Sequence, residues 1–357
     1  MKKLKFPSLF LTGLCLSGSL LFSSCEKEPK STPAPVAPTP PGAKGPYEHG
    51  VFVINEGNTL GAISYYNPSS KVVRKDIFQD ENNRPVGQFL QSMAVHNEKA
   101  YLVAGGSKKL EIVDANTFKS IGVISGLEIP RYFITSGNKG YLTDYVTYSG
   151  NGQVNIIDLN TNTITKTITV GKLPELMAIV ENKLYITNSA DNFISVINLT
   201  TETAEAPITI GQGPSSLVVD ANKKLWVLCG SSYGTDPGSL AQVDPVTGAV
   251  ERNFPILARS ASPQDLAING QKNRLYFTLD NKIYSMGISD AALPATPLVD
   301  RGTKGFYGLG VDPQENIIYG AYAPDFSSEG KVIRYNPGGA AIDSFNVSVG
   351  PNGFVFK

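Results

Sequence analysis

The sequence is poor in the residues on which most catalytic and metal sites depend. Its 357 residues include two histidines and three cysteines. Neither His49 nor His96 has a nucleophile or a second metal ligand at a recognisable spacing. No CxxC or haem-attachment motif occurs, and no glycine-rich phosphate loop leads into a helix. We therefore expect a non-enzyme with no catalytic residue, metal site or required cofactor. The spacing argument does not apply to an enzyme whose metal or cofactor ligands come from segments far apart in the sequence.

The chain also has no excess of charge of either sign. It carries 31 lysines and arginines against 31 aspartates and glutamates. A nucleic-acid-binding surface needs a basic patch, which this balance does not suggest, so no nucleic acid partner is expected. The apolar fraction of 41% is ordinary for a folded soluble chain. Length alone suggests two or so domains, although repetitive all-β folds of this size often form one.

The three cysteines leave no disulfide within the folded part. Cys15 and Cys25 lie in the first 25 residues, which form a separate segment, so Cys229 stands alone. It occurs in the apolar run KLWVLCG, where a cysteine is usually a small buried hydrophobe. We expect Cys229 to be buried and unreactive.

The first residues form an export signal. A basic stretch, MKKLK, precedes a short apolar run that ends in small residues before Cys25. The run is too short, and its end too similar to a cleavage site, for a retained membrane helix. The pattern resembles a bacterial lipoprotein signal, in which the cysteine is diacylated and becomes the mature N-terminus. We predict a signal peptide over 1–24 and a lipid anchor at Cys25. The alternative is a plain secretory signal with an incidental cysteine.

A proline-rich segment follows, EKEPKSTPAPVAPTPPGAKGP. With so little apolar bulk it cannot build a core, and its prolines favour an extended chain. We predict that 25–48, the lipidated cysteine included, is a disordered linker to the outer membrane. A surface-exposed location is expected, and a periplasm-facing one stays open.

From about residue 49 the chain repeats a short strand pattern. The strand KLYITNSA has counterparts at intervals of about 40–50 residues, rich in alternating apolar and β-branched residues. That period is typical of a β-propeller. We predict that 49–357 is an all-β, seven-bladed β-propeller of four-stranded antiparallel blades, without helices. The seven copies begin at Gly50, Lys99, Lys139, Lys183, Lys223, Asn273 and Asn316.

A tight turn recurs after the third strand of the copies. Asp114, Asp158 and Asp244 are each followed three residues later by a threonine. An aspartate in this position bonds the following backbone N–H groups and shapes the turn. We interpret these acids as turn formers, not as metal ligands or catalytic acids.

The two ends of the repeat region are complementary. The first copy begins at GVFVINEG, which is a second strand, so it lacks an inner strand. The last copy completes its outer strand, and PNGFVFK then adds one inner strand too many. We predict that Pro351–Lys357 pairs with Val51–Asn55 and closes the ring, which removes two exposed sheet edges.

Two stretches carry a family resemblance. The segments GVFVINEGN and GAISYYNP resemble the DUF5074 family of Bacteroidetes surface lipoproteins, and later repeats such as LPELMAIVENKLYITNSADNFISVINLTTET look like YncE-type propellers of the YVTN class. The resemblance extends to BtuG-like cobalamin-binding proteins, which cap an outer-membrane TonB-dependent transporter. It implies a propeller that binds cobalamin as a ligand.

One face of the propeller is the expected binding surface. In a four-stranded blade, the loops that lead into the inner strand and those that follow the second strand lie together, and such loops often carry function. In NEGN we favour a turn-forming role, with Glu56 as a receiver of a ligand donor or cation left open. Other residues of these loops are Asp144, Glu175, Ser215, Gln264 and Phe326. The candidate ligand-binding residues are Asn55, Glu56, Asn58, Gln88, Phe89, Arg131, Tyr132, Tyr145, Tyr148, Asn188, Tyr233, Asp265, Phe306, Tyr307, Tyr322, Asp325 and Asn352.

Aromatic rings with amide and carboxyl partners suit a large, partly apolar small molecule. We therefore expect a cell-surface lipoprotein that captures a cofactor-like nutrient, cobalamin or a relative, for a TonB-dependent transporter. The alternatives are a glycan-binding module and a protein-interaction scaffold of the cell envelope. For each candidate residue, packing between blades or support of its own loop is the competing interpretation.

Overall fold

The structure is a computed structural model that describes residues 44–230, 238–256 and 263–357. The predicted signal peptide over 1–24, the predicted anchor Cys25, most of the predicted linker and the candidate Tyr233 lie outside these ranges. No helix within them is long and apolar enough to cross a membrane.

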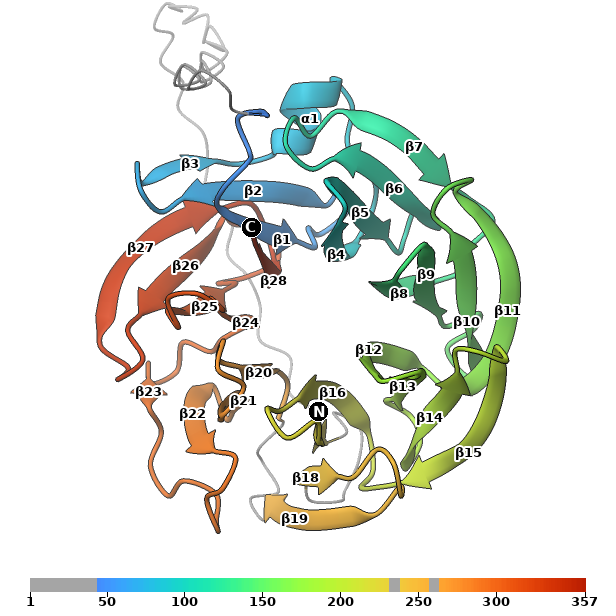
Figure 1. Cartoon of the computed structure of the whole chain (residues 1–357). Coiled ribbons are helices and arrows are strands. Elements are labelled where there is room, and N and C mark those ends of the chain that lie inside the picture. The colour runs from blue at the N-terminus through green and yellow to red at the C-terminus, as the bar shows by residue number, and fades with distance from the viewer. Residues whose placement is uncertain (1–43, 231–237, 257–262) are drawn as a thin grey trace, which may run out of the picture. The chain divides into compact units, whose positions relative to one another are not determined.

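Seven four-stranded antiparallel sheets form a ring of blades (Figure 1). This confirms the predicted seven-bladed propeller. Blade 1 contains β28 (Pro351–Phe356), β1 (Val51–Asn55), β2 (Ala62–Asn67) and β3 (Val72–Arg74). Blade 2 contains β4 (Leu90–His96), β5 (Lys99–Ala104), β6 (Lys109–Asp114) and β7 (Ser120–Ile124). Blade 3 contains β8 (Pro130–Ser136), β9 (Lys139–Asp144), β10 (Asn151–Asp158) and β11 (Thr163–Lys172). Blade 4 contains β12 (Pro174–Val180), β13 (Lys183–Asn188), β14 (Phe193–Asn198) and β15 (Thr203–Thr209).

The remaining three blades follow the same order from the centre outwards. Blade 5 contains β16 (Pro214–Val219), β17 (Leu225–Cys229), β18 (Gly238–Val243) and β19 (Val250–Ile256). Blade 6 contains β20 (Leu266–Ile268), β21 (Arg274–Leu279), β22 (Lys282–Gly287) and β23 (Val299–Asp300). Blade 7 contains β24 (Gly308–Val311), β25 (Ile318–Tyr322), β26 (Gly330–Tyr335) and β27 (Ala341–Val347).

The prediction of a helix-free propeller was wrong in one place, because a short helix, α1 (Ile77–Asn82), follows β3. The Asp76 carboxylate caps it by accepting the N–H of Gln79, and Asn83 ends it in a left-handed conformation. Six residues are too few to display a helical period, which is why the sequence pattern did not reveal α1.

The hydrophobic core is divided among the interfaces between blades. Seven clusters of buried side chains occur in the described residues, and each joins two neighbouring blades. The second strand of a blade is covered on both faces, so all five residues of β17 are buried. Cys229 is one of them, and burial raises the pKa of its thiol to about 12. The structure thus confirms that Cys229 is buried.

The predicted aspartate turns are present. The carboxylates of Asp114, Asp158 and Asp244 each accept the backbone N–H groups two and three residues later, over 2.8–3.4 Å. These bonds occupy the acids within their own turns. The turn-forming interpretation of the sequence is confirmed.

The ring closes as predicted. Strand β28 pairs antiparallel with β1, from Val51 opposite Phe356 to Asn55 opposite Pro351. Blade 1 thus takes its inner strand from the C-terminal end of the sequence, and each of the seven blades has four strands. Phe354 and Phe356 of β28 pack around the buried ring of Tyr319 in blade 7, with centroid distances of 5.7 and 5.2 Å.

A short strap before β1, residues 44–50, fastens this closure. Tyr47 is fully buried; its N–H donates to the carbonyl of Asn116 (3.0 Å) and its hydroxyl to the carboxylate of Glu81 (2.9 Å). The Lys357 ammonium donates to the Tyr47 carbonyl at 3.1 Å. The packed part of the chain therefore includes residues that the sequence had assigned to the linker.

The propeller has two distinct faces. Backbone bonds join the loop after the second strand to the loop that leads into the inner strand, as from Tyr145 to Ile129 (3.1 Å) and from Ser189 to Leu173 (3.0 Å). We call the face formed by these two sets of loops the mouth face. The strap joins β1 at its other end, so it lies on the opposite face.

Candidate functional site

The inner strands surround a central cavity of about 410 Å³ at their mouth-face ends. Each of the seven blades contributes to its wall, which follows from the ring topology. Deeper along the same strands, Met93, Phe133, Leu266 and Phe354 add apolar surface. Taken in blade order from blade 1, the wall includes Asn352, Gln91, Arg131, Glu175, Ser215, Asp265 and Leu309.

One half of the wall is a network of mutually paired groups. The Arg131 guanidinium donates twice to the Glu175 carboxylate, at 3.1 and 3.2 Å, and also to the side-chain oxygen of Gln91. The Gln91 amide donates to the hydroxyl of Tyr132 at 3.2 Å. The hydroxyl of Tyr145 donates to Glu175, and its ring centroid lies 4.8 Å from the guanidinium carbon of Arg131. These contacts fix the side chains of blades 2–4 before any ligand arrives.

Burial shapes the acid–base properties of this network. It raises the pKa of the Glu175 carboxyl, an effect that the neighbouring Arg131 guanidinium opposes. Burial also raises the pKa of the Tyr132 hydroxyl, which therefore stays a neutral hydrogen-bonding group. The groups of this network pair with one another, and none of them is a nucleophile paired with a base.

The polar groups of the other half of the wall have fewer hydrogen-bond partners. Asp265 receives one long bond, from the Thr278 hydroxyl at 3.4 Å, and no lysine, arginine or histidine of the described residues forms an ion pair with it. The Asn352 amide nitrogen donates to two backbone carbonyls at 3.3 Å, but its oxygen has no partner among the residues that the structure describes. The Ser215 hydroxyl also lacks a partner in the described residues. Such groups are uncommon in native proteins and call for an explanation.

The buried carboxyl of Asp265, which forms no ion pair with any described residue, predicts a pH-dependent effect of Asp265→Asn on stability. Burial raises the pKa of Asp265 to about 7, so the folded state holds its proton more strongly than the unfolded chain. The resulting stabilisation is complete below about pH 4 and is lost as the pH rises through 7. We expect the variant to be more stable than the wild type by about 2–4 kcal/mol at pH 8 and equal to it at pH 4. Urea unfolding at both pH values measures this, and an unchanged midpoint at pH 8 would contradict it.

Exposed aromatic side chains lie on the mouth face, on loops of blades 2, 3 and 7. In the described residues Phe89, Tyr148 and Phe326 are the exposed aromatic side chains, with 44%, 73% and 48% of their surface accessible. All three stand on mouth-face loops, as does the exposed Leu60, whereas other exposed aliphatic side chains, such as Ile121 and Val246, lie on outer strands or on opposite-face turns. Exposed rings gathered on one face are typical of a binding surface.

Glu56 links the rim to the cavity. Its carboxylate accepts a hydrogen bond from the hydroxyl of Tyr307, whose ring meets Phe326 edge-on at a centroid distance of 5.0 Å. The backbone N–H of Glu56 donates to the carbonyl of Gly350 at 2.8 Å. This residue of NEGN thus has a partner within the protein, yet it stays partly exposed on the mouth face.

The structure divides the predicted site residues into four groups. Asn55 and Asn188 are fully buried, and each donates to backbone and to a serine within its own blade. Asp325 accepts four bonds from Ser327 and Ser328, which lower its pKa to about 2 and hold its own loop. Phe306 is buried between blades, and Tyr322 lies 4.7 Å from the guanidinium carbon of Arg301. The cavity or its mouth-face rim holds Glu56, Asn58, Gln88, Phe89, Arg131, Tyr132, Tyr145, Tyr148, Asp265, Tyr307 and Asn352.

Gln91 was missed by the sequence prediction. It is the second residue of an inner strand, the position that Arg131, Glu175 and Ser215 occupy in the next three blades. Aligning the inner strands by this position would have found it. Phe89, directly before its inner strand, has a positive φ of 47°. Leu173 and Gly213 occupy the same position in their blades and are also left-handed, so the conformation belongs to the repeat.

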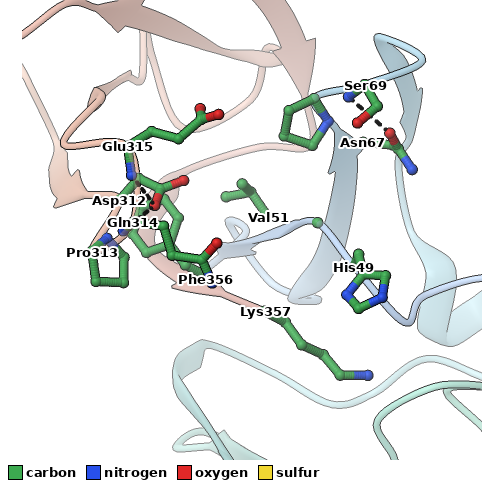
Figure 2. A pocket seen from close by; sticks show the side chains of 12 residues that line it. His49, Val51, Asn67, Ser69, Asp312, Pro313, Gln314, Glu315, Phe356 and Lys357 are labelled. Carbon is green, nitrogen blue, oxygen red and sulfur yellow. Dashed lines mark hydrogen bonds between the residues drawn. The ribbon is translucent and has the colours of Figure 1, made fainter. Parts of the chain in front are cut away.

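A second pocket, of about 200 Å³, lies on the opposite face beside the ring closure (Figure 2). Asp312 and Glu315 stand on one side of it, and His49 and Lys357 on another. Its acceptors are used locally, since Asp312 takes the N–H groups of Gln314 and Glu315. The Lys357 ammonium bonds the strap. The central cavity is larger, and more of its polar groups lack hydrogen-bond partners among the described residues. We therefore treat it as the candidate site.

Within the described ranges, no three His, Cys, Asp or Glu side chains come together as potential metal ligands. The chain belongs to the DUF5074 family, a domain of unknown function whose model matches residues 49–354. No protein with a curated description matches it.

Solved structures with the same fold include a quinoprotein alcohol dehydrogenase-like protein from Bacteroides thetaiotaomicron. It is 15% identical, with a TM-score of 0.68 over 87% of this chain and 78% of that one. Hydrazine synthase from Kuenenia stuttgartiensis is 14% identical, with a TM-score of 0.58 over 72% and 85%. A computationally designed protein is 11% identical, with a TM-score of 0.59 over 88% and 92%. At these identities the likeness concerns the fold alone.

Proposed function

We propose that this member of the DUF5074 family captures cobalamin or a related cofactor-like nutrient and passes it to an outer-membrane TonB-dependent transporter. In this proposal the chain is a surface-exposed lipoprotein of the outer membrane with its lipid at Cys25. It acts as the BtuG-like and YncE-like propellers that its repeats resemble, and it binds its ligand without converting it.

The observation that carries the proposal is a polar cavity that opens on the face where the exposed aromatic side chains lie. A cavity of about 410 Å³ is within the range of small-molecule sites. Its wall supplies carboxylate, amide and hydroxyl groups, and its rim supplies exposed rings. A corrinoid has an apolar ring system edged with amide groups. It is larger than the cavity, so it would lie across the rim and place one edge inside.

The strap supports the proposed arrangement at the membrane. It joins the propeller on the face opposite the mouth, where Tyr47 is buried. A linker that continues from this point leaves the cavity mouth accessible to a ligand and to a transporter. Attachment on the mouth face would obstruct both.

Titration with cyanocobalamin tests the proposal. We expect saturable heat and a change in the visible absorbance of the corrinoid, with a Kd in the micromolar range or tighter. The rim variant Phe89→Ala/Tyr148→Ala should weaken binding by roughly tenfold or more, because aromatic anchors dominate binding energy. Val246→Ala, which removes an exposed apolar side chain from an opposite-face turn, is the matched control and should bind normally.

Other outcomes redirect the proposal. Absence of both signals with cyanocobalamin at concentrations near 1 mM would overturn cobalamin capture. Heat with a glycan panel would then favour glycan binding, for which the exposed rings are also suited. Co-purification with an outer-membrane barrel, without any small-molecule signal, would favour the scaffold.

A further inference from the structure

We infer that the part of the ligand that enters the central cavity carries a cationic or N–H-donating group, and that Asp265, assisted by Asn352, receives it. This deepens the proposed function by naming the chemistry of the bound edge. It rests on the same cavity but not on the ligand being a corrinoid.

The first step is the asymmetry of the wall. The Arg131 guanidinium, the strongest donor in the cavity, is already occupied by Glu175 and Gln91. A ligand carboxylate or phosphate would have to displace a bidentate ion pair to reach it. The blade 2–4 side of the wall therefore supports the site and does not favour an anion.

The second step is the unused accepting capacity on the opposite side. An ionised carboxylate has about four acceptor positions. The described residues fill one of those of Asp265, with the long bond from Thr278. Asn352 lies two blades away on the same wall and is held by its nitrogen, so its oxygen is left without a partner among the described residues. Oxygen acceptors without partners select for donors in the ligand.

The third step is the balance of charge. Among the described residues, the cavity wall and the adjoining Glu56 hold three carboxyl groups, those of Glu56, Glu175 and Asp265, and one guanidinium, that of Arg131. A concave site lined by one sign of charge concentrates ligands of the other sign. Burial disfavours the charged form of Asp265, and a carboxylate held against that preference is typical of a functional position.

Two probes matched in size test the inference on the full chain. Benzylamine and benzyl alcohol present the same ring, but only the amine is a cation. At pH 8 we expect isothermal titration of the wild type to show benzylamine binding about tenfold or more tightly, as a charge-assisted bond would give. In Asp265→Asn this preference should disappear, while cyanocobalamin, if bound, should also weaken by roughly tenfold. A thermal melt shows that the variant is folded.

Glu128→Gln is the control, because it removes a carboxylate from an exposed ion pair with Lys108 beside the mouth face. It should keep the full preference for benzylamine. Equal affinity of the two probes for the wild type, no binding of either, or a preference that survives in Asp265→Asn would each overturn the inference. A preference for benzylamine without cyanocobalamin binding would refute the proposed function and leave this inference standing.

Discussion

A chain that ends at Gly350 is expected not to form a stable ring. Removal of 351–357 takes the inner strand from blade 1 and leaves β1 with an unpaired edge toward the centre. It also removes Phe354 and Phe356 from the cluster that joins blades 7 and 1. Several backbone bonds at about 0.5–1.5 kcal/mol each, together with two partly buried aromatic side chains that each contribute less than the roughly 1.5–3 kcal/mol of full burial, are comparable with the whole stability of a domain.

Thermal melting and sedimentation of the truncated chain measure this effect. We expect aggregation, or a melting temperature lower by tens of degrees, because unpaired sheet edges associate. The control is removal of Lys357 alone, which keeps every β28–β1 pair but loses the contacts of its ammonium with the strap and its two backbone bonds to Gly50. A cooperative melt at the wild-type temperature after removal of 351–357 would show that closure by β28 does not hold the ring together.

The closed ring was predictable from the order of strand types in the repeats. A second-strand motif at the start and a surplus inner strand at the end can satisfy each other in only one way. The strap was not predictable, because GPYEHG has the composition of a linker and Tyr47 gains its partners from Glu81 and Asn116, which are distant in sequence. Local pattern cannot show a contact that tertiary structure creates.

The mouth face was predictable for the same topological reason, but the surroundings of its individual residues were not. Asn55 and Asn188, predicted as ligand contacts, are buried and donate to serines on the next strand of their blades, Ser64 and Ser195, while their side-chain oxygens have no partner among the described residues. Sequence shows that a polar residue ends a strand, but not whether its partner is a ligand or the protein. The distinction between the paired and the unpaired half of the wall depends on distances across blades and needs the structure.

Replacing Arg131 by methionine should destabilise the protein strongly and in a pH-dependent way. The variant leaves the Glu175 carboxyl buried without its cation, and loss of one member of a buried pair typically costs about 3–5 kcal/mol. The pKa of Glu175, already raised by burial, would rise further. Stability gained by holding that proton is present at low pH and is lost as the pH rises through the folded-state pKa. The deficit should therefore be small at pH 4 and largest at pH 8.

The double variant Arg131→Met/Glu175→Gln separates the contribution of the ion pair to stability from that of side-chain packing. Because it removes both charges, we expect it to recover most of the stability lost by Arg131→Met at pH 8 and to show little pH dependence, since an uncharged pair of similar volume is often as stable as an ion pair. Urea unfolding of the wild type, both single variants and the double variant at pH 4 and 8 provides the cycle. If the double variant were as unstable as Arg131→Met at pH 8, packing of the guanidinium against the ring of Tyr145, and not the burial of an unpaired carboxylate, would be the main contribution of Arg131.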